Sequence, residues 1–136
     1  INHLQDCAKD YRELDRVYIP RDTMEKHGVT VEALSAPAAS PDLMRCLQDL
    51  AAHTAMLLED SRVFSAQIND RRLAMEVAAI QSLADRLVSL LLTRDPLSER
   101  VHLSKLQMLL VGLAGATGGL VRWLITRAAP SSAYAR

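Results

Sequence analysis

The sequence is 136 residues long, with 49% hydrophobic and 24% charged residues. This balance is typical of a folded globular protein and excludes a disordered or low-complexity chain. Sixteen Lys and Arg residues balance sixteen Asp and Glu residues, so we expect no nucleic-acid partner. Aromatic residues make up only 4%, and glycine and proline are few, which favours helices over a β-sandwich. The composition therefore predicts an all-α fold.

Helical periodicity and helix-breaking residues divide the chain into predicted elements. Pro20 and Pro96 each end a helical stretch, because the residue before a proline is disfavoured in the α region. Gly28 is expected at the left-handed position that closes a short helix. In chain order, we expect a helix over 1–14, an exit over 16–20, a short helix over 21–27, a turn over 30–34 with a Thr cap, a loop over 35–41, and long helices over 42–68, 71–93 and 103–126.

The long helices carry broad apolar faces. In 71–93 the apolar residues alternate steps of three and four, which places them on one stripe that must pack on other helices. The longest apolar run, 106–120, is shorter than the roughly 20 residues that span a bilayer. We interpret it as part of a core or interfacial helix, with membrane contact as the alternative. The stripe consists of Leu73, Val77, Ile80, Ala84, Leu87 and Leu91.

The two cysteines, Cys7 and Cys46, show neither metal-ligand nor redox-motif spacing. Each lies in a helical pattern with apolar neighbours, where a reduced and inert thiol is expected. A disulfide framework is not expected, so the cysteines favour a reducing cytosol.

Asp6 and Asp10 are four residues apart, so both carboxylates project from one face of the first helix, about a turn apart. Two like charges at this spacing destabilise a helix unless a cation lies between them. Mg²⁺ suits such a pair because it binds through one or two carboxylates, water and diphosphate oxygens. The alternative is a solvated helix face neutralised by Lys9 and Arg12.

Two further groups could bind an anion. Arg16 and Tyr18 would point to the same side of an extended exit, where both can donate hydrogen bonds to phosphate oxygens. The alternative is a surface arginine and a tyrosine that anchors the turn. Residues 99–105 place three cationic side chains before the last helix, and Ser104 is a candidate cap for it. Alone, such a basic cluster is usually a solvated loop.

These motifs together are similar to a known family. The run N-H-L-Q-D-C-A-K-D-Y over 2–11, followed by D-R-V-Y-I-P-R over 15–21, resembles the second aspartate-rich motif of the squalene/phytoene synthase family, the head-to-head isoprenoid synthases. The segment R-V-H-L-S-K over 100–105 is similar to the family's segment before the final helix. The resemblance implies an all-α isoprenoid synthase bundle around an apolar cavity for prenyl chains.

The resemblance also implies how much of that bundle is present. Residues 1–127 would form the C-terminal half of a single synthase domain, and 128–136 a flexible tail. The first aspartate-rich motif of the family, on an earlier helix, has no counterpart in this sequence. We therefore expect the chain by itself to be inactive.

The resemblance assigns roles to eight residues. Metal and cationic side chains would stabilise the leaving diphosphate, and the apolar cavity would keep water from the carbocation. It implies Mg²⁺ as cofactor, held by Asp6 and Asp10, with Tyr18 as a further catalytic residue. The implied substrate- or diphosphate-binding residues are Asn2, Arg16, Arg100, Gln5 and Gln81.

Within the family, the run I-N-H-L-Q-D-C-A-K-D-Y over 1–11 is most similar to the bacterial hopanoid-pathway branch of the hydroxysqualene synthase type. This implies ionisation of presqualene diphosphate, itself made from two farnesyl diphosphates, and capture of the cation by water without NADPH. Gln5 and Gln81 stand where many members have Arg and Tyr, and either could position water. Head-to-head condensation of farnesyl diphosphate to presqualene diphosphate, squalene or phytoene is the alternative reaction.

Two non-enzyme alternatives are a helical interaction module and a membrane-associated module. Neither explains why the aspartate pair is followed by an arginine and a tyrosine. Under the family resemblance, we expect a location in the bacterial cytoplasm, peripheral to the inner membrane. Handover of the apolar product to other hopanoid-pathway enzymes is a further expected partnership.

Overall fold

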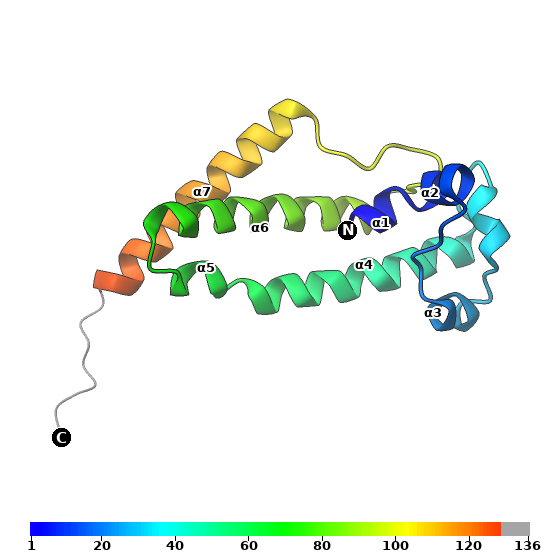
Figure 1. Cartoon of the computed structure of the whole chain (residues 1–136), viewed down its shortest axis with the longest axis horizontal. Helices are drawn as coiled ribbons and strands as arrows, with labels where there is room; N and C mark the ends of the chain where they lie inside the picture. Colours follow the sequence, from blue (N-terminus) through cyan, green and yellow to red (C-terminus); the bar gives the residue numbers. More distant parts are fainter. Residues whose placement is uncertain (129–136) are drawn as a thin grey trace, which may run out of the picture. The chain divides into compact units, whose positions relative to one another are not determined.

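The computed structural model describes residues 1–128, and this part of the chain is helical, without strands (Figure 1). The predicted all-α class is confirmed. Ala128, expected to begin the tail, is the last residue of the final helix, and 129–136 lie outside the described residues. The elements are α1 (Asn2–Gln5), α2 (Cys7–Leu14), α3 (Arg21–Lys26), the 3-10 helix η1 (Val31–Ser35), α4 (Pro41–Ser61), α5 (Phe64–Gln67), α6 (Arg71–Leu91) and α7 (Lys105–Ala128).

The first predicted helix is divided at Asp6, which separates α1 from α2. Asp6 has φ −104° and ψ 9°, outside the helical region. The hydrogen bonds nevertheless continue, from Asp6 N to Asn2 O at 2.9 Å and from Asp10 N to Asp6 O at 2.8 Å. Asn2, Asp6 and Asp10 therefore keep the one-turn spacing that the sequence predicts.

The helix predicted over 42–68 is also divided, because α4 ends at Ser61 and α5 restarts at Phe64. At this end the Ser61 hydroxyl donates to the Leu58 carbonyl at 2.9 Å. The next amide bonds to a carbonyl three residues back rather than four. Such tightening commonly ends an α-helix.

Two predicted helix boundaries are confirmed. Gly28 closes the α3 turn with φ 65°, a conformation that costs glycine little. Ser104 caps α7 in a reciprocal box, in which its hydroxyl accepts the Gln107 N–H at 3.2 Å and the Gln107 side chain accepts the Ser104 N–H at 3.0 Å. Because Ser104 is the cap, α7 begins at Lys105, two residues later than predicted.

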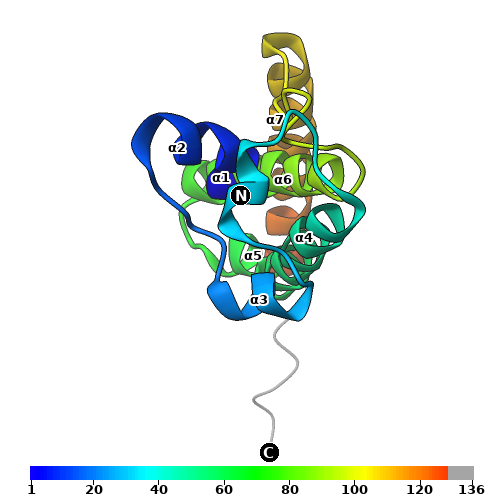
Figure 2. The same cartoon turned by 90° about the vertical axis from the view of Figure 1, so that its right-hand side faces the viewer.

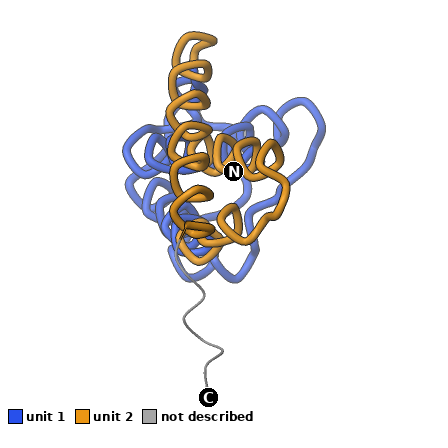
Figure 3. The backbone as a smooth tube through the Cα atoms, turned by 90° about the vertical axis from the view of Figure 1, so that its left-hand side faces the viewer, with its two compact units in different colours: residues 1–57, 85–103 blue, residues 58–84, 104–136 orange. Residues whose placement is uncertain are grey.

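The described residues form two compact units (Figure 3). The first unit, called here the motif unit, contains Ile1–Leu57 and Asp85–Leu103. The second, called the α7 unit, contains Leu58–Ala84 and the described residues from Ser104 onward. The aspartate motif and Arg100 therefore belong to the same unit.

The motif unit has a core of mostly aliphatic side chains that also includes both thiols. In it, Gln48 of α4 donates through Nε2 to the Leu92 carbonyl at 2.9 Å, which joins the first part of α4 to the end of α6. Both cysteines are buried and free, as predicted. The largest fully buried side chains are Leu34, Leu43, Leu47, Leu91, Val101 and Cys46.

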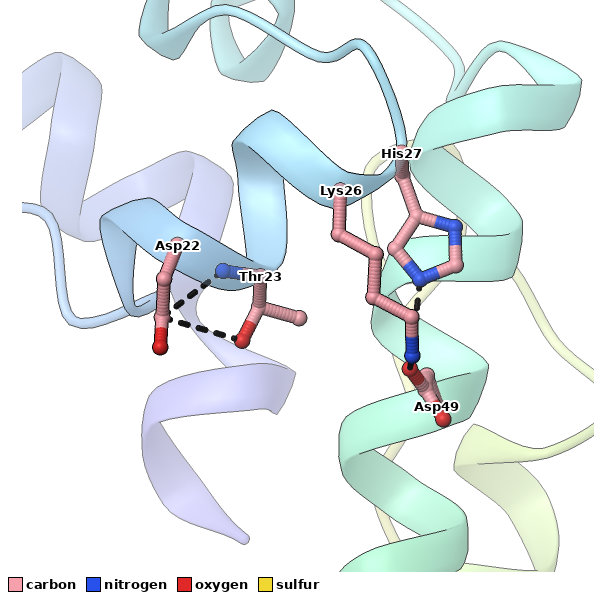
Figure 4. A network of polar contacts seen from close by, with 5 residues as sticks. All are labelled: Asp22, Thr23, Lys26, His27 and Asp49. Atoms are coloured by element: carbon pink, nitrogen blue, oxygen red, sulfur yellow. Dashed lines mark hydrogen bonds and ion pairs between the residues drawn. The ribbon is translucent and has the colours of Figure 1, made fainter.

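Helix α3 lies beside the first part of α4, where Asp49 joins the two helices (Figures 2 and 4). Lys26 Nζ lies 2.7 Å and His27 Nε2 lies 3.2 Å from Asp49 Oδ2. The hydrogen bond from Lys26 and then that from His27 lower the pKa of Asp49 below its ordinary value. The same contact raises the pKa of Lys26. Because these groups face solvent, salt screens the attraction.

In the α7 unit, α6 and α7 pack through small residues. A Cβ atom built on Gly115 would lie 2.4 Å from Ser82 Oγ, and one built on Gly119 would lie 2.4 Å from the Ala78 Cβ. Real Cβ atoms do not approach other atoms so closely. The two helices can therefore meet at this distance only because α7 carries glycine there.

This packing uses a different face of α6 from the predicted apolar stripe. In the first half of α6 the buried residues are Ala74 and Ala78, whereas Leu73 is 48% and Ile80 is 65% exposed. The periodicity correctly predicts a helix, but the face against α7 is the one with the smallest side chains. The physical reason is the close approach that the glycines of α7 allow.

Helix α7 also packs on α5. The Trp123 indole donates to the Ile68 carbonyl at 3.1 Å, and the Arg127 guanidinium lies 4.2 Å from the centre of the Trp123 ring. By length and composition alone, α7 is long and apolar enough to cross a membrane, and 11% of its most apolar window is buried. The helix thus extends beyond the apolar run 106–120 at its C-terminal end.

Candidate functional site

The two motif aspartates are half-buried on α1 and α2. Within the described residues, no ion pair or hydrogen bond engages either carboxylate. Lys9 and Arg12, the alternative counter-charges, do not pair with them; Arg12 instead donates to the Ala36 carbonyl at 2.6 Å. Neither Asp6 nor Asp10 therefore forms an ion pair with a cationic side chain of the described residues.

The donor set fits Mg²⁺ only together with another ligand. In the described part of the chain, no group of three or more His, Cys, Asp or Glu side chains is placed to hold a metal ion. Mg²⁺ keeps several waters and is commonly bound through one or two carboxylates plus substrate phosphates. Asp6 and Asp10 match that requirement, because diphosphate oxygens and water would complete the shell.

A pocket of about 450 Å³ lies between the first two helices and the segment over 96–102. Asp6 lines this pocket, and so do Gln5 and Arg100. Asn2 and Asp10 are not among its lining residues, although they share the α1–α2 face with Asp6. The structure therefore brings together three of the eight predicted site residues around one space.

Gln5 is buried, and its side chain forms a hydrogen bond with the segment that carries Arg100. Its Nε2 donates a hydrogen bond to the Val101 carbonyl. Val101 is fully buried, whereas Arg100 is exposed. The side-chain amide of Gln5 thus contacts the backbone next to Arg100.

Asp95 stabilises the start of the same segment. Its carboxylate accepts hydrogen bonds from Ala39 N at 2.9 Å, Leu97 N at 2.8 Å and Ser98 Oγ at 2.8 Å. Burial opposes its ionisation, but the amides of Ala39 and Leu97 outweigh burial and hold the pKa of Asp95 below its ordinary value. A charged Asp95 therefore joins the loop before α4 to the turn before Arg100.

The exit from α2 returns toward α1. Asp15 adopts a left-handed conformation with φ 51°, and the Arg16 N–H donates to the Asp10 carbonyl at 3.1 Å. Tyr18 stacks on His3, with ring centroids 3.8 Å apart and planes inclined by 19°. Arg16 and Tyr18 are both exposed, so their side chains are accessible to a ligand.

Gln81 belongs to the α7 unit, where its amide is engaged by the end of α4. Its Nε2 donates to the Leu58 carbonyl at 2.8 Å, and its Oε1 accepts the Ser61 hydroxyl at 3.0 Å. These contacts give Gln81 a structural role at the end of α4.

Three of the basic residues that line the pocket were not assigned to the site from the sequence. Lys9, Arg12 and His102 line the pocket with Asp6 and Arg100. A signal was available, because positions 5, 9 and 12 share one helical face. Counted without His102, the pocket is lined by the three cationic side chains of Lys9, Arg12 and Arg100 and by the two acidic side chains of Asp6 and Glu99, a small positive excess that suits an anionic ligand.

Comparison with known proteins identifies the family. The family model of squalene/phytoene synthase matches residues 1–107. The chain is 51% identical to the hydroxysqualene synthase of Rhodopseudomonas palustris over 121 residues, 46% identical to that of Sinorhizobium fredii over 121 residues and 48% identical to that of Zymomonas mobilis over 120 residues.

These matches cover 89%, 89% and 88% of this chain, respectively. They cover 41%, 41% and 40% of the relatives, so the chain spans less than half their length. No solved structure matches the chain significantly. The resemblance seen in the sequence motifs is confirmed, and the chain belongs to the squalene/phytoene synthase family.

Proposed function

We propose that the full-length protein ionises presqualene diphosphate and lets water capture the rearranged cation, which yields hydroxysqualene without NADPH. The observation that carries this proposal is the Asp6–Asp10 pair, which forms no ion pair with the described residues and stands beside the pocket that Arg100 lines. The names of the three relatives support the same reaction. Its place would be the biosynthesis of hopanoids or other triterpenoids.

Under this proposal, the residues of the motif unit bind and orient the diphosphate. Asp6 and Asp10 hold Mg²⁺, which when bound supplies positive charge to the leaving diphosphate. Arg16 and Arg100 donate charge-assisted hydrogen bonds to its oxygens. Tyr18 donates a neutral hydrogen bond from its phenol.

Asn2 contributes a polar side chain one turn before Asp6, on the same helical face. Its amide can donate to a diphosphate oxygen without adding charge. Its backbone carbonyl already accepts the Asp6 amide at 2.9 Å, so the position of Asn2 is coupled to that of Asp6.

Condensation of two farnesyl diphosphates is the competing reaction, since it requires the same diphosphate site. Product analysis of the full-length protein separates the two. We expect hydroxysqualene from presqualene diphosphate with Mg²⁺ and without NADPH. Accumulation of presqualene diphosphate from farnesyl diphosphate, or squalene formed only when NADPH is added, would contradict water capture.

The proposal extends to the chain of 136 residues by itself, which we expect to be inactive. The reason is that the family's first aspartate-rich motif is not in this sequence. An assay of this chain with farnesyl or presqualene diphosphate tests the point. Turnover above the rate without protein would contradict it.

We also propose a cytoplasmic location at the surface of the bacterial inner membrane, with handover of the apolar product to other hopanoid-pathway enzymes. The length and apolar composition of α7 support the membrane association in this proposal. Co-sedimentation of the full-length protein with phospholipid vesicles tests it. A membrane-associated module without enzyme activity would sediment in the same way but would show no Mg²⁺-dependent diphosphate binding.

A further inference from the structure

We infer that Gln5 is a positioning residue, whose side-chain amide joins the segment that carries Arg100 to α1. The guanidinium of Arg100 is thereby kept at the pocket that Asp6 lines. The inference rests on the proposed function for the nature of the ligand, a diphosphate. The anchoring itself depends only on contacts within the motif unit.

Buried and exposed side chains alternate along residues 100–103, and this alternation indicates the orientation of the segment. Val101 and Leu103 are buried, whereas Arg100 and His102 are exposed and line the pocket. This is the pattern of an extended chain that directs alternate side chains to opposite sides. The inward side chains fix the segment in the core, and the outward ones include the cationic guanidinium of Arg100.

The hydrogen bond from Gln5 is the principal polar contact of this segment. Within the described chain, the backbone of residues 100–103 makes no other hydrogen bond to protein groups. Glu99 N still bonds to Asp95 O at 3.1 Å, which ends the turn before Arg100. Removal of the Gln5 amide would leave the buried Val101 carbonyl without its donor, a loss that is costly in a protein interior.

Gln5 is poorly placed to act directly on an anion. It is only 8% exposed, and its amide nitrogen is engaged by the Val101 carbonyl. An uncharged amide also supplies less attraction to a diphosphate than the exposed guanidinium of Arg100. The effect of Gln5 on the ligand is therefore transmitted through the position of Arg100.

A double-mutant cycle in the full-length protein tests this role, with inorganic pyrophosphate and Mg²⁺ as the probe in calorimetric titrations. Gln5→Met removes the amide and preserves the length of the side chain. We expect it to weaken pyrophosphate binding about tenfold, the factor that corresponds to one lost hydrogen bond of ordinary strength. We expect Arg100→Ala to weaken it at least as much, and the double variant to bind no worse than Arg100→Ala.

Gln48→Met is the matched control. Gln48 also donates from a side-chain amide to a backbone carbonyl in the motif unit, but its partner is Leu92, away from the pocket. Its loss should reduce the thermal midpoint without changing pyrophosphate affinity. If Gln5→Met does not fold, Gln5→Asn replaces it, because a side chain shorter by one methylene withdraws the donor from Val101.

Cleavage by trypsin after Arg100 provides a readout that needs no ligand. We expect faster cleavage at this bond in the Gln5 variant and an unchanged rate in Gln48→Met. Unchanged cleavage, wild-type pyrophosphate affinity, or losses that add in the double variant would each overturn the inference. If the unsubstituted protein does not bind pyrophosphate with Mg²⁺, the proposed function fails, while the cleavage rate still decides whether Gln5 anchors the segment.

Discussion

Gly119 and Ala78 occupy positions where α7 and α6 leave no room for another carbon atom. A Cβ on Gly119 would lie 2.4 Å from the Ala78 Cβ and 3.4 Å from the Ala74 carbonyl oxygen. The atoms in the way are a rigid methyl group and a backbone group, so neither can rotate aside. The close approach of the two helices therefore depends on the glycine.

Gly119→Ala is expected to destabilise the protein by about 1–3 kcal/mol, the usual cost of overpacking, despite the higher helix propensity of alanine. Gly112→Ala is the matched control, because no atom lies within 4 Å of its added Cβ. That substitution should stabilise α7 by up to about 1 kcal/mol. Urea unfolding of both variants measures the difference, and equal effects would show that α6 and α7 do not meet at Gly119.

Asp6→Asn and Asp10→Asn should each reduce activity of the full-length protein by about 10²–10³-fold, the range seen when one group that stabilises a transition state is removed. The reason is that an amide oxygen lacks the charge that Mg²⁺ requires. Asp15→Asn is the control, since Asp15 is exposed and asparagine tolerates its left-handed backbone. Steady-state assays over a range of Mg²⁺ concentrations measure these activities. Comparable losses of activity in Asp6→Asn, Asp10→Asn and Asp15→Asn would contradict a specific role of the Asp6–Asp10 pair.

The thiol of Cys7 should resist alkylation in the native protein. Burial raises the pKa of Cys7 to about 11, so only about one thiol in a thousand is ionised at pH 8, and the thiolate is the reactive form. We expect iodoacetamide to label Cys7 at pH 8 only after unfolding in urea, as judged by mass spectrometry of the tryptic peptides. Rapid labelling of the folded protein at pH 8 would contradict burial of this thiol.

The same shift predicts a loss of stability at alkaline pH. The unfolded chain loses the Cys7 proton near 9.0, whereas the folded chain retains it until about 11. Because the unfolded state then binds fewer protons, the free energy of unfolding falls as the pH rises through this interval. Thermal unfolding at pH 8 and pH 10.5 should therefore show a smaller fall in Cys7→Ala than in the unsubstituted protein.

Asp95→Asn should destabilise the protein by about 1 kcal/mol at pH 7, because an amide replaces a carboxylate that accepts three hydrogen bonds. The pKa of Asp95 is lowered from 3.8 on folding, so the charged form favours the folded state. Its contribution is complete above about pH 5, well above the unfolded pKa, and is lost as the pH falls through the lower folded pKa.

Acid unfolding curves measure this contribution of Asp95. The variant and the unsubstituted protein should approach each other in stability as the pH falls below 3.8. Asp60→Asn is the control, since Asp60 is exposed on α4 and no hydrogen bond or ion pair to it is resolved. A constant difference between Asp95→Asn and the unsubstituted protein from pH 7 to pH 2 would refute the role of the charge.

The sequence correctly predicts the features that depend on residues close together along the chain. Gly28 and Ser104 end and begin helices through backbone conformation and capping by residues a few positions away, so their neighbours suffice to reveal them. The spacing of Asp6 and Asp10 likewise survives the division of the first helix. The family motif can also be recognised from the sequence, because each of its parts lies within a short segment.

The features that the sequence does not predict depend on contacts between residues that are far apart along the chain. Periodicity finds the helix that contains Leu73, but only the approach of α7 decides that Ala74 and Ala78 face inward. The bond between Gln5 and Val101 joins positions 96 residues apart, and no pattern along the chain marks either as a partner. The role of Gln5 is therefore visible only in the folded chain.

The left-handed turn at Asp15 has a consequence for how this motif can vary. It reverses the chain within one residue, so that the Arg16 amide meets the Asp10 carbonyl and the Tyr18 ring meets His3. The helical part of the motif and its exit are thus joined by a connection of fixed length. The exposed side chains of Glu13 and Leu14 can be exchanged with little effect on this geometry, whereas one inserted or deleted residue would move the tyrosine away from its partner.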